Sequence, residues 1–194
     1  MTEFEIIQKA FPVEIREEVN SLLTKFAIET KLSTKGFEAV VIGQEKLEIP
    51  QRVYYKPPYS LVESKLTQQE QEILNCIFSR HDNGFIRQKS VQNIIGSNNN
   101  WTVPYIVKII GEYVIEILND IYNSFEIINK SDLISFVQQN PDFYNRTRSR
   151  VGSYWDCYFS RQFPEILNGI RTPEKQRYVG FRLLNKIDKL INDK

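Results

Sequence analysis

One stretch of sequence, residues 101–125 (WTVPYIVKIIGEYVIEILNDIYNSF), constrains the fold more than any other part of the chain. Wound as an α-helix, its apolar side chains cover most of the circumference, and a helix that is apolar nearly all round is buried. Three asparagines before it offer N-cap side chains, and Pro104 suits a first helical turn. We therefore predict a long central helix around which the other elements pack.

The central stretch also carries a thin polar stripe. Lys108, Glu112 and Glu116 lie at intervals of four residues, so they stack on one side of the predicted helix. Each charge near the middle of a membrane span costs roughly 2.5–3.5 kcal/mol. We therefore interpret the stretch as the core helix of a soluble domain and not as a membrane span.

Length and composition place the rest of the chain in one domain with this helix. The 194 residues are 41% hydrophobic and 25% charged, which is ordinary for a globular protein with one good core. We expect a single domain over residues 1–194, with N-terminal helices in 1–30, a β-hairpin in 37–55 and a helical core in 66–194. The expected fold class is mainly α, a compact helical bundle with a small N-terminal β-hairpin.

The hairpin is indicated by two runs of strand-forming residues around a tight turn. Residues 37–42 are rich in Phe and β-branched side chains, residues 47–49 alternate apolar and acidic ones, and Gly43-Gln44 between them suits the turn. Pro50 confines the second strand to a sheet edge or ends it. Because an isolated two-stranded hairpin is marginal in water, this one must lie against the helices or pair with another element.

Helical periodicity marks both flanks of the hairpin. Residues 3–11 form a short helix that stops at Pro12, and residues 13–29 repeat apolar side chains at the spacing of one buried face. After the hairpin, Thr67 and Glu70 form a capping box that starts a helix. We expect a turn over residues 80–84 with Gly84 at positive φ, followed by a second helix that ends at Gly96. A later short helix should start at Ser131 or Asp132 and end before Asn140-Pro141. The next helical segment has a weak point at Gly152, and a last helix covers residues 174–192.

The sequence offers little chemistry for a metal or a cofactor. Cys76 and Cys157 lack CxxC spacing, and His81 is the single histidine, so a zinc site of the usual kind is not expected. The acidic N-terminal segment has no uncharged run long enough for a signal peptide. We expect a cytoplasmic protein with free thiols, no metal and no cofactor.

Charge divides the chain into two parts. Residues 144–194 hold 11 Lys and Arg against 5 Asp and Glu, whereas the residues before them hold 14 against 19. Such asymmetry indicates either electrostatic pairing between the two parts or an anionic partner for the C-terminal part.

Basic and aromatic side chains are interleaved in the C-terminal part. Arginine suits phosphates and acidic surfaces, and aromatic rings stack on unpaired bases or anchor protein interfaces. A plainer interpretation exists, because Tyr and Trp at helical spacing often belong to the core and the arginines can neutralise Glu14, Glu17 and Glu18. The candidate partner-binding residues are Arg146, Arg148, Arg150, Tyr154, Trp155, Tyr158, Arg161, Arg177 and Arg182.

Glu112 and Glu116 form a second group of candidates. Two carboxylates one turn apart can ligate a metal in a helical bundle, but such sites need Glu-x-x-His partners that this chain lacks. An unpaired buried charge is costly, so we expect both glutamates to form structural ion pairs. The expected partners are Arg80, Arg87 and the C-terminal arginines, because arginine pairs with carboxylates through two parallel hydrogen bonds.

His81 and Asp82 are the one histidine-based pair that suits acid–base chemistry. A nucleophile is missing beside them. Cys76 lies five residues before His81 but on the apolar side of its helix, where a thiol is inert. We therefore expect no catalytic residue, and a hydrolase centred on His81 and Asp82 stays an alternative.

Residues 67–95 resemble a HEAT-type unit, a pair of helices joined by a turn. Asp82 stands in the turn, and Ile86-Arg87 opens the second helix. The resemblance implies a helical protein-interaction scaffold. The combination of RHDNGFIRQ, EYVIEIL and RVGSYWDCYF is also similar to bacterial proteins without an assigned function, a likeness that carries no functional expectation.

These patterns predict a non-enzymatic binding or adaptor protein of the bacterial cytoplasm. It engages a macromolecular partner through its basic, aromatic-rich C-terminal part. We expect the partner to be a protein. The alternative is a nucleic acid that binds the same Arg and aromatic surface, and we expect no membrane binding. The sequence does not set the oligomeric state.

Overall fold

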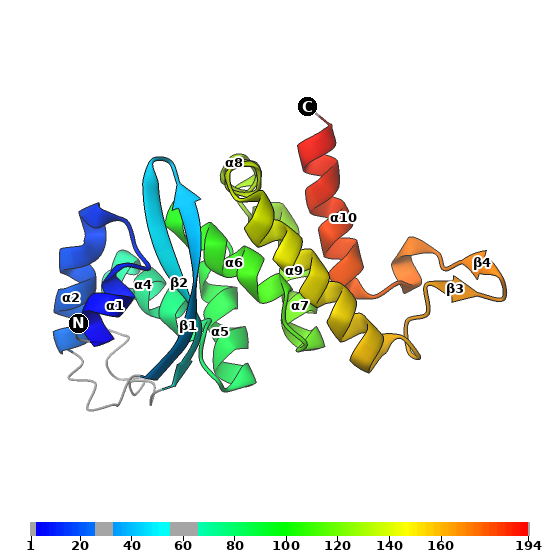
Figure 1. Cartoon of the computed structure of the whole chain (residues 1–194), viewed down its shortest axis with the longest axis horizontal. Helices are drawn as coiled ribbons and strands as arrows, with labels where there is room; N and C mark the ends of the chain where they lie inside the picture. The colour runs from blue at the N-terminus through cyan, green and yellow to red at the C-terminus, as the bar shows by residue number, and fades with distance from the viewer. Residues whose placement is uncertain (1–2, 26–32, 55–65, 194) are drawn as a thin grey trace.

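A computed structural model of the chain describes residues 3–25, 33–54 and 66–193. It confirms the expected fold class, because the chain is mainly α-helical with a small β-hairpin near its N-terminus (Figure 1). The elements are α1 (Glu3–Gln8), η1 (Val13–Ile15), α2 (Arg16–Lys25), β1 (Ser33–Ile42), β2 (Glu45–Tyr54), α4 (Gln68–Phe78), α5 (Gly84–Ile94), η2 (Asn100–Thr102), α6 (Val103–Ile110), α7 (Ile115–Asn123), η3 (Phe125–Ile127), α8 (Lys130–Gln139), α9 (Pro141–Tyr154), η4 (Trp155–Phe159), β3 (Ile166–Leu167), β4 (Ile170–Arg171), η5 (Glu174–Gln176) and α10 (Val179–Asn192).

The N-terminal helices are shorter than their apolar periodicity predicts. The helix expected over 13–29 begins with a 3-10 turn, η1, and its α-helical part, α2, ends at Lys25. The rest of that prediction lies outside the described residues. Val19, Leu22 and Leu23 are fully buried, as the expected buried face requires.

The predicted hairpin is confirmed. Strands β1 and β2 pair in antiparallel register, with Ile42 opposite Glu45 across a tight turn. Gly43 takes a φ of 60°, a conformation that glycine adopts without strain. Pro50 lies within β2 opposite Phe37, which is tolerated because both strands of a two-stranded sheet are edges.

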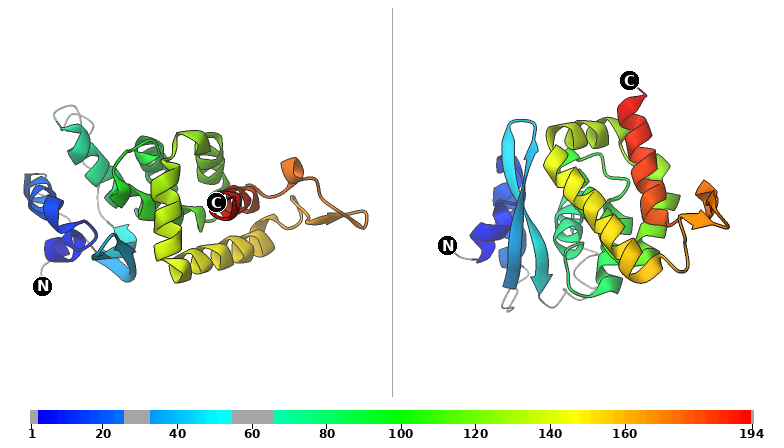
Figure 2. Two further views of the ribbon diagram at one scale, coloured as in Figure 1. Left: turned by 90° about the horizontal axis from the view of Figure 1, so that it is seen from above. Right: turned by 45° about the vertical axis from the view of Figure 1, so that its right-hand side comes forward.

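Hydrogen bonds tie the hairpin to helices on both sides. In β2, the backbone N–H of Glu48 donates to the carbonyl of Lys9 at 2.9 Å, and that of Val53 donates to the carbonyl of Arg80 at 2.9 Å. In β1, Val41 exchanges two hydrogen bonds of 2.7 and 2.8 Å with the side chain of Asn140. The hairpin therefore lies between α1 and α2 on one side and the helical core on the other (Figures 1 and 2).

Helices α4 and α5 form the expected pair. The capping box of Thr67 and Glu70 is present at the start of α4. The prediction of a positive φ at Gly84 is wrong. The side chain of Asn83 caps α5 by accepting from the N–H of Phe85 at 2.9 Å, so Gly84 already belongs to the helix.

The prediction of a single long central helix is also wrong, because the stretch forms two helices. Every residue of α6 is buried, but the helix ends at Ile110 and α7 begins only at Ile115. Glycine at position 111 is a poor helix former, and the turn directs the next side chain, Glu112, to arginines on other elements. Within the described ranges, no helix is long and apolar enough to cross a membrane.

The C-terminal helices follow the predicted order with shifted boundaries. Asn129 caps α8 in place of Ser131 or Asp132, because its side chain reaches the N–H of Asp132 at 3.2 Å. Helix α9 passes Gly152 without a break and continues into a π-helical turn, η4. Helix α10 starts five residues later than predicted, since residues 174–176 form a separate 3-10 turn.

Candidate functional site

Helix α9 presents three of the predicted partner-binding arginines, and all three meet carboxylates of this chain. Arg146 donates through Nε to Glu38 of β1, and Arg150 Nη1 lies 3.7 Å from the same carboxylate. Arg148 Nη1 is 2.6 Å from both oxygens of Asp188 on α10. These arginines of the basic C-terminal part are thus paired inside the molecule. Their partners are Glu38 and Asp188, whereas Glu14, Glu17 and Glu18 were expected.

The predicted aromatic residues divide between core and surface. The Trp155 indole donates to the carbonyl of Phe163 at 2.8 Å, and its ring packs on Phe181 with centroids 5.4 Å apart. Tyr154 is half-buried, whereas Tyr158 is exposed and stacks on Tyr154. Trp155 is therefore part of the packing, and Tyr158 is the more available ring.

The remaining predicted arginines lie in different settings. Arg177 donates through Nε to Glu165 at 3.0 Å, and the Arg182 guanidinium lies 4.0 Å from the centroid of the Tyr122 ring. Arg161 is exposed and makes no ion pair with any residue that the structure describes. The same is true of Arg171 in β4, which belongs to the same basic and aromatic part of the sequence.

Residues 160–177, here called the arm, project from the helical body between η4 and α10 (Figures 1 and 2). Within the arm, β3 and β4 form a short antiparallel hairpin. Asn168 and Gly169 connect the strands with φ angles of 53° and 80°. The Asn-Gly dipeptide between apolar residues is a strong hairpin signal in the sequence, and it could have located this element.

The tip of the arm exposes large apolar side chains. Ile166 is 67% exposed and Ile170 is 74% exposed. Thr172 holds the base of the hairpin, because its hydroxyl donates to the carbonyl of Pro164 at 2.5 Å and its N–H donates to that of Glu165 at 2.9 Å. The exposed isoleucines are thus presented on an anchored loop.

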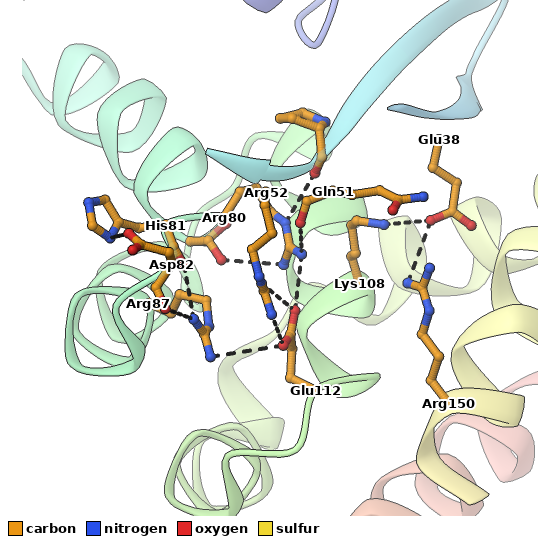
Figure 3. A network of polar contacts seen from close by, with 12 residues as sticks. Glu38, Gln51, Arg52, Arg80, His81, Asp82, Arg87, Lys108, Glu112 and Arg150 are labelled. Atoms are coloured by element: carbon orange, nitrogen blue, oxygen red, sulfur yellow. Dashed lines mark hydrogen bonds and ion pairs between the residues drawn. The ribbon is translucent and has the colours of Figure 1, made fainter. Parts of the chain in front are cut away.

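A second group of candidates surrounds Glu112, in the turn between α6 and α7 (Figure 3). Both its oxygens accept hydrogen bonds from Arg52 of β2, at 2.8 and 2.6 Å. Arg80 Nη2 donates to it at 3.0 Å, and Arg87 Nη2 lies 3.9 Å away. We call these four residues the Glu112 cluster.

The arginines control the charge state of the buried Glu112 carboxylate. Burial alone raises its pKa, but the hydrogen bonds from Arg52 and the charges of Arg80 and Arg87 outweigh burial and lower the pKa to about 2. The predicted ion pairing of Glu112 is therefore observed, although no C-terminal arginine takes part. The prediction for Glu116 is wrong, because it is exposed on α7 beyond the helix break and makes no ion pair within the described residues.

Glu38 of β1 gathers a second set of cations. Lys108 Nζ of α6 donates to it at 2.5 Å, Arg146 donates to it from α9, and Arg150 lies 3.7 Å away. We call these residues the Glu38 cluster. Burial raises the pKa of Glu38, yet the hydrogen bonds from Lys108 and Arg146 bring it below its usual value.

His81 and Asp82 do not form a catalytic arrangement. His81 Nδ1 accepts from the backbone N–H of Asn83 at 2.9 Å, so this nitrogen cannot also donate to Asp82, whose Oδ1 lies 2.9 Å from it. Cys76 is fully buried, and burial raises the pKa of its thiol well above the usual value. A pocket of about 570 Å³ adjoins the turn, and its described lining includes the carboxylates of Asp82 and Glu116 but no serine, threonine, cysteine or lysine.

Comparisons with known proteins give no match: no family model, no curated protein and no solved structure resembles the chain.

Proposed function

We propose that this chain is a non-enzymatic binding protein that engages a protein partner through the arm. The observation that carries the proposal is the presentation of Ile166 and Ile170, which are 67% and 74% exposed on an anchored hairpin that projects from the body. Exposed apolar side chains on a projecting element are typical anchors of protein interfaces. A cytoplasmic setting is part of the proposal, and the free thiols of Cys76 and Cys157 support it.

The charges around the hairpin favour a partner with acidic residues around an apolar recess. Arg161, Arg171 and Lys175 are exposed on the arm, and none of them pairs with a described carboxylate. Arginine at the rim of an apolar contact adds specificity and speeds association with an acidic surface. The predicted surface on α9 contributes less, because Arg146 and Arg148 are already bonded to Glu38 and Asp188.

Nucleic acid stays the alternative partner, but the geometry favours it less. Binding of single strands requires aromatic faces beside free cations. The rings of Trp155 and Phe181 pack on each other, and Tyr178 stacks on Phe159 with centroids 4.9 Å apart. Tyr158 and Tyr113 are the exposed rings beside this region, with centroids 6.1 Å apart, and a pair of rings offers a small stacking platform.

Site-specific photocrosslinking in the host tests the proposal. A photoreactive residue replaces Ile170, and a matched control carries it at Ile127, which is 62% exposed on η3, outside the arm. We expect a discrete protease-sensitive adduct from position 170 and none from position 127. No adduct at position 170, equal adducts at both positions, or an adduct removed by nuclease would overturn the protein-partner proposal.

A further inference from the structure

A small polar pocket lies between the Glu112 cluster and the Glu38 cluster. Its volume is about 160 Å³. Four cationic side chains and one carboxylate line it, and Glu38, which pairs with Lys108 and Arg150 beside it, leaves an excess of two positive charges at neutral pH. A recess with such an excess and low-dielectric walls concentrates anions. The charged lining residues are Arg52, Arg80, Lys108, Glu112 and Arg150.

Two of these cations hold hydrogen-bond donors that the protein does not use. Lys108 is 1% exposed, and its ammonium has three N–H bonds, yet Glu38 is its one acceptor among the described residues. Arg150 makes no hydrogen bond within the described part of the chain, and its nearest carboxylate oxygen is 3.7 Å away. Buried donors without acceptors are costly, so the N–H bonds of Lys108 favour a ligand that supplies acceptors, and the partly exposed Arg150 can offer its donors to the same ligand.

The fold fixes Arg150 over the pocket. Its side chain crosses the end of α6 at Gly111, where an added Cβ would lie 3.3 Å from Arg150 Cδ. Glycine at this position therefore permits the close approach of α9 to α6. In Figure 3, Arg150 and Lys108 converge on the same oxygen of Glu38 from different helices.

The size of the pocket suits a compact oxyanion. A cavity needs about 10–15 Å³ to hold one water molecule, so a pocket of about 160 Å³ has room for a phosphoryl group and a small part of the molecule that carries it. A phosphoryl dianion neutralises more of the excess charge than a carboxylate can. Its several oxygens also match the planar donor set of arginine and the unused N–H bonds of lysine.

We propose that this pocket binds the phosphoryl group of a phosphate monoester, with Arg150 and Lys108 as its direct donors. The electrostatic environment agrees with this assignment. Burial and the charge of Arg80 lower the pKa of Lys108 to about 8, and burial, opposed by Glu112, lowers the pKa of Arg80 to about 10. Burial is the larger cause in both cases, and neighbouring cations act in the same direction. The site is separate from the arm and does not depend on the arm binding a protein.

Isothermal titration of the full chain with inorganic phosphate tests the site. The informative variant is Arg150→Gln, which removes a partly exposed donor without breaking any hydrogen bond among the described residues. We expect millimolar or tighter binding to the natural chain and an affinity at least about tenfold lower for Arg150→Gln, the equivalent of 1.4 kcal/mol. Acetate should bind more weakly than phosphate, because it carries one charge instead of two.

Arg148→Gln is the matched control. Arg148 lies on the same helix with a side chain 43% exposed, against 34% for Arg150, but it faces Asp188 and not the pocket. Its phosphate affinity should equal that of the natural chain, with circular dichroism showing that both variants are folded. The proposal is overturned if the natural chain does not bind phosphate, if the two variants lose affinity equally, or if acetate binds as tightly as phosphate.

Discussion

The Glu112 cluster and the Glu38 cluster each place three cations around one buried carboxylate, yet they use their hydrogen-bond donors differently. Both oxygens of Glu112 are bonded to Arg52, and Arg80 adds a further bond while it also donates to backbone carbonyls of β2 and to that of its neighbour Ser79. In the Glu38 cluster, Lys108 uses one donor and Arg150 none. In the first cluster the carboxylate is fully bonded and the unused donors belong to the buried Arg87, whereas in the second the unused donors, those of Lys108 and Arg150, border a pocket.

We infer from this difference that the Glu112 cluster stabilises the fold and that the Glu38 cluster belongs to a binding site. Arg52 and Arg80 join the hairpin and α4 to the turn between α6 and α7, so Glu112 fastens three parts of the fold to one another. Arg87, which donates to the carbonyls of His81 and Asp82 at 2.9 and 2.8 Å, supports the same region but keeps two nitrogens without a hydrogen bond. The Glu38 cluster instead borders a pocket with spare positive charge.

The largest effect is expected from Glu112→Gln. The substitution keeps the shape of the side chain but leaves buried guanidinium groups without a counter-charge. Removing one partner of a buried ion pair costs about 3–5 kcal/mol. Urea unfolding followed by circular dichroism should show this loss, and an unchanged free energy of unfolding would mean that Glu112 does not fasten the fold.

Lowering the pH should reduce the free energy of unfolding through the same residue, Glu112, by a somewhat smaller amount. The pKa of Glu112 is about 2 in the folded chain against 4.5 for a free glutamate, so its contribution is present above pH 4.5 and is lost as the pH falls toward 2. The loss amounts to about 3 kcal/mol at 1.36 kcal/mol per pH unit. Other carboxylates titrate in this window, so the quantity to measure is the difference in pH dependence between the natural chain and Glu112→Gln. Parallel curves would contradict the assignment.

Glu38→Gln should cost less than Glu112→Gln, roughly 1–3 kcal/mol. Lys108 can release its proton when its carboxylate partner is removed, whereas the arginines around Glu112 cannot. The pKa of Lys108, already lowered to about 8, should fall further in this variant. Thermal unfolding of the two variants side by side measures the contrast, and equal losses would remove the distinction between the clusters.

Local signals in the sequence were sufficient to predict much of the fold. The capping box at Thr67, the tight turn at Gly43 and the apolar faces of the helices each depend on neighbouring residues, and each is observed. The break between α6 and α7 was missed, although Gly111 marks it locally. The partners that hold Glu112 in the turn had no local signal, because Arg52 and Arg80 lie 60 and 32 residues away along the chain.

Prediction of the candidate sites was limited in the same way, because their contacts join residues that lie far apart in the sequence. The ion pairing of Glu112 followed from the cost of a buried charge, but its main partner, Arg52, stands on a strand where no periodicity marks it. Glu38 was absent from the predictions, although it binds two arginines of α9 and Lys108. The Asn168-Gly169 turn was different, because its signal is local and was overlooked.

The pKa of Lys108, followed through its Nζ resonance by NMR in the full chain, tests the central distinction most directly. We predict a value near 8 in phosphate-free buffer, below the ordinary 10.5, and a rise when millimolar sulfate is added. Sulfate is chosen because it stays a dianion throughout the titration. A value at or above 10.5 without sulfate, or a value that sulfate does not change, would contradict a pocket with unused positive charge beside Glu38.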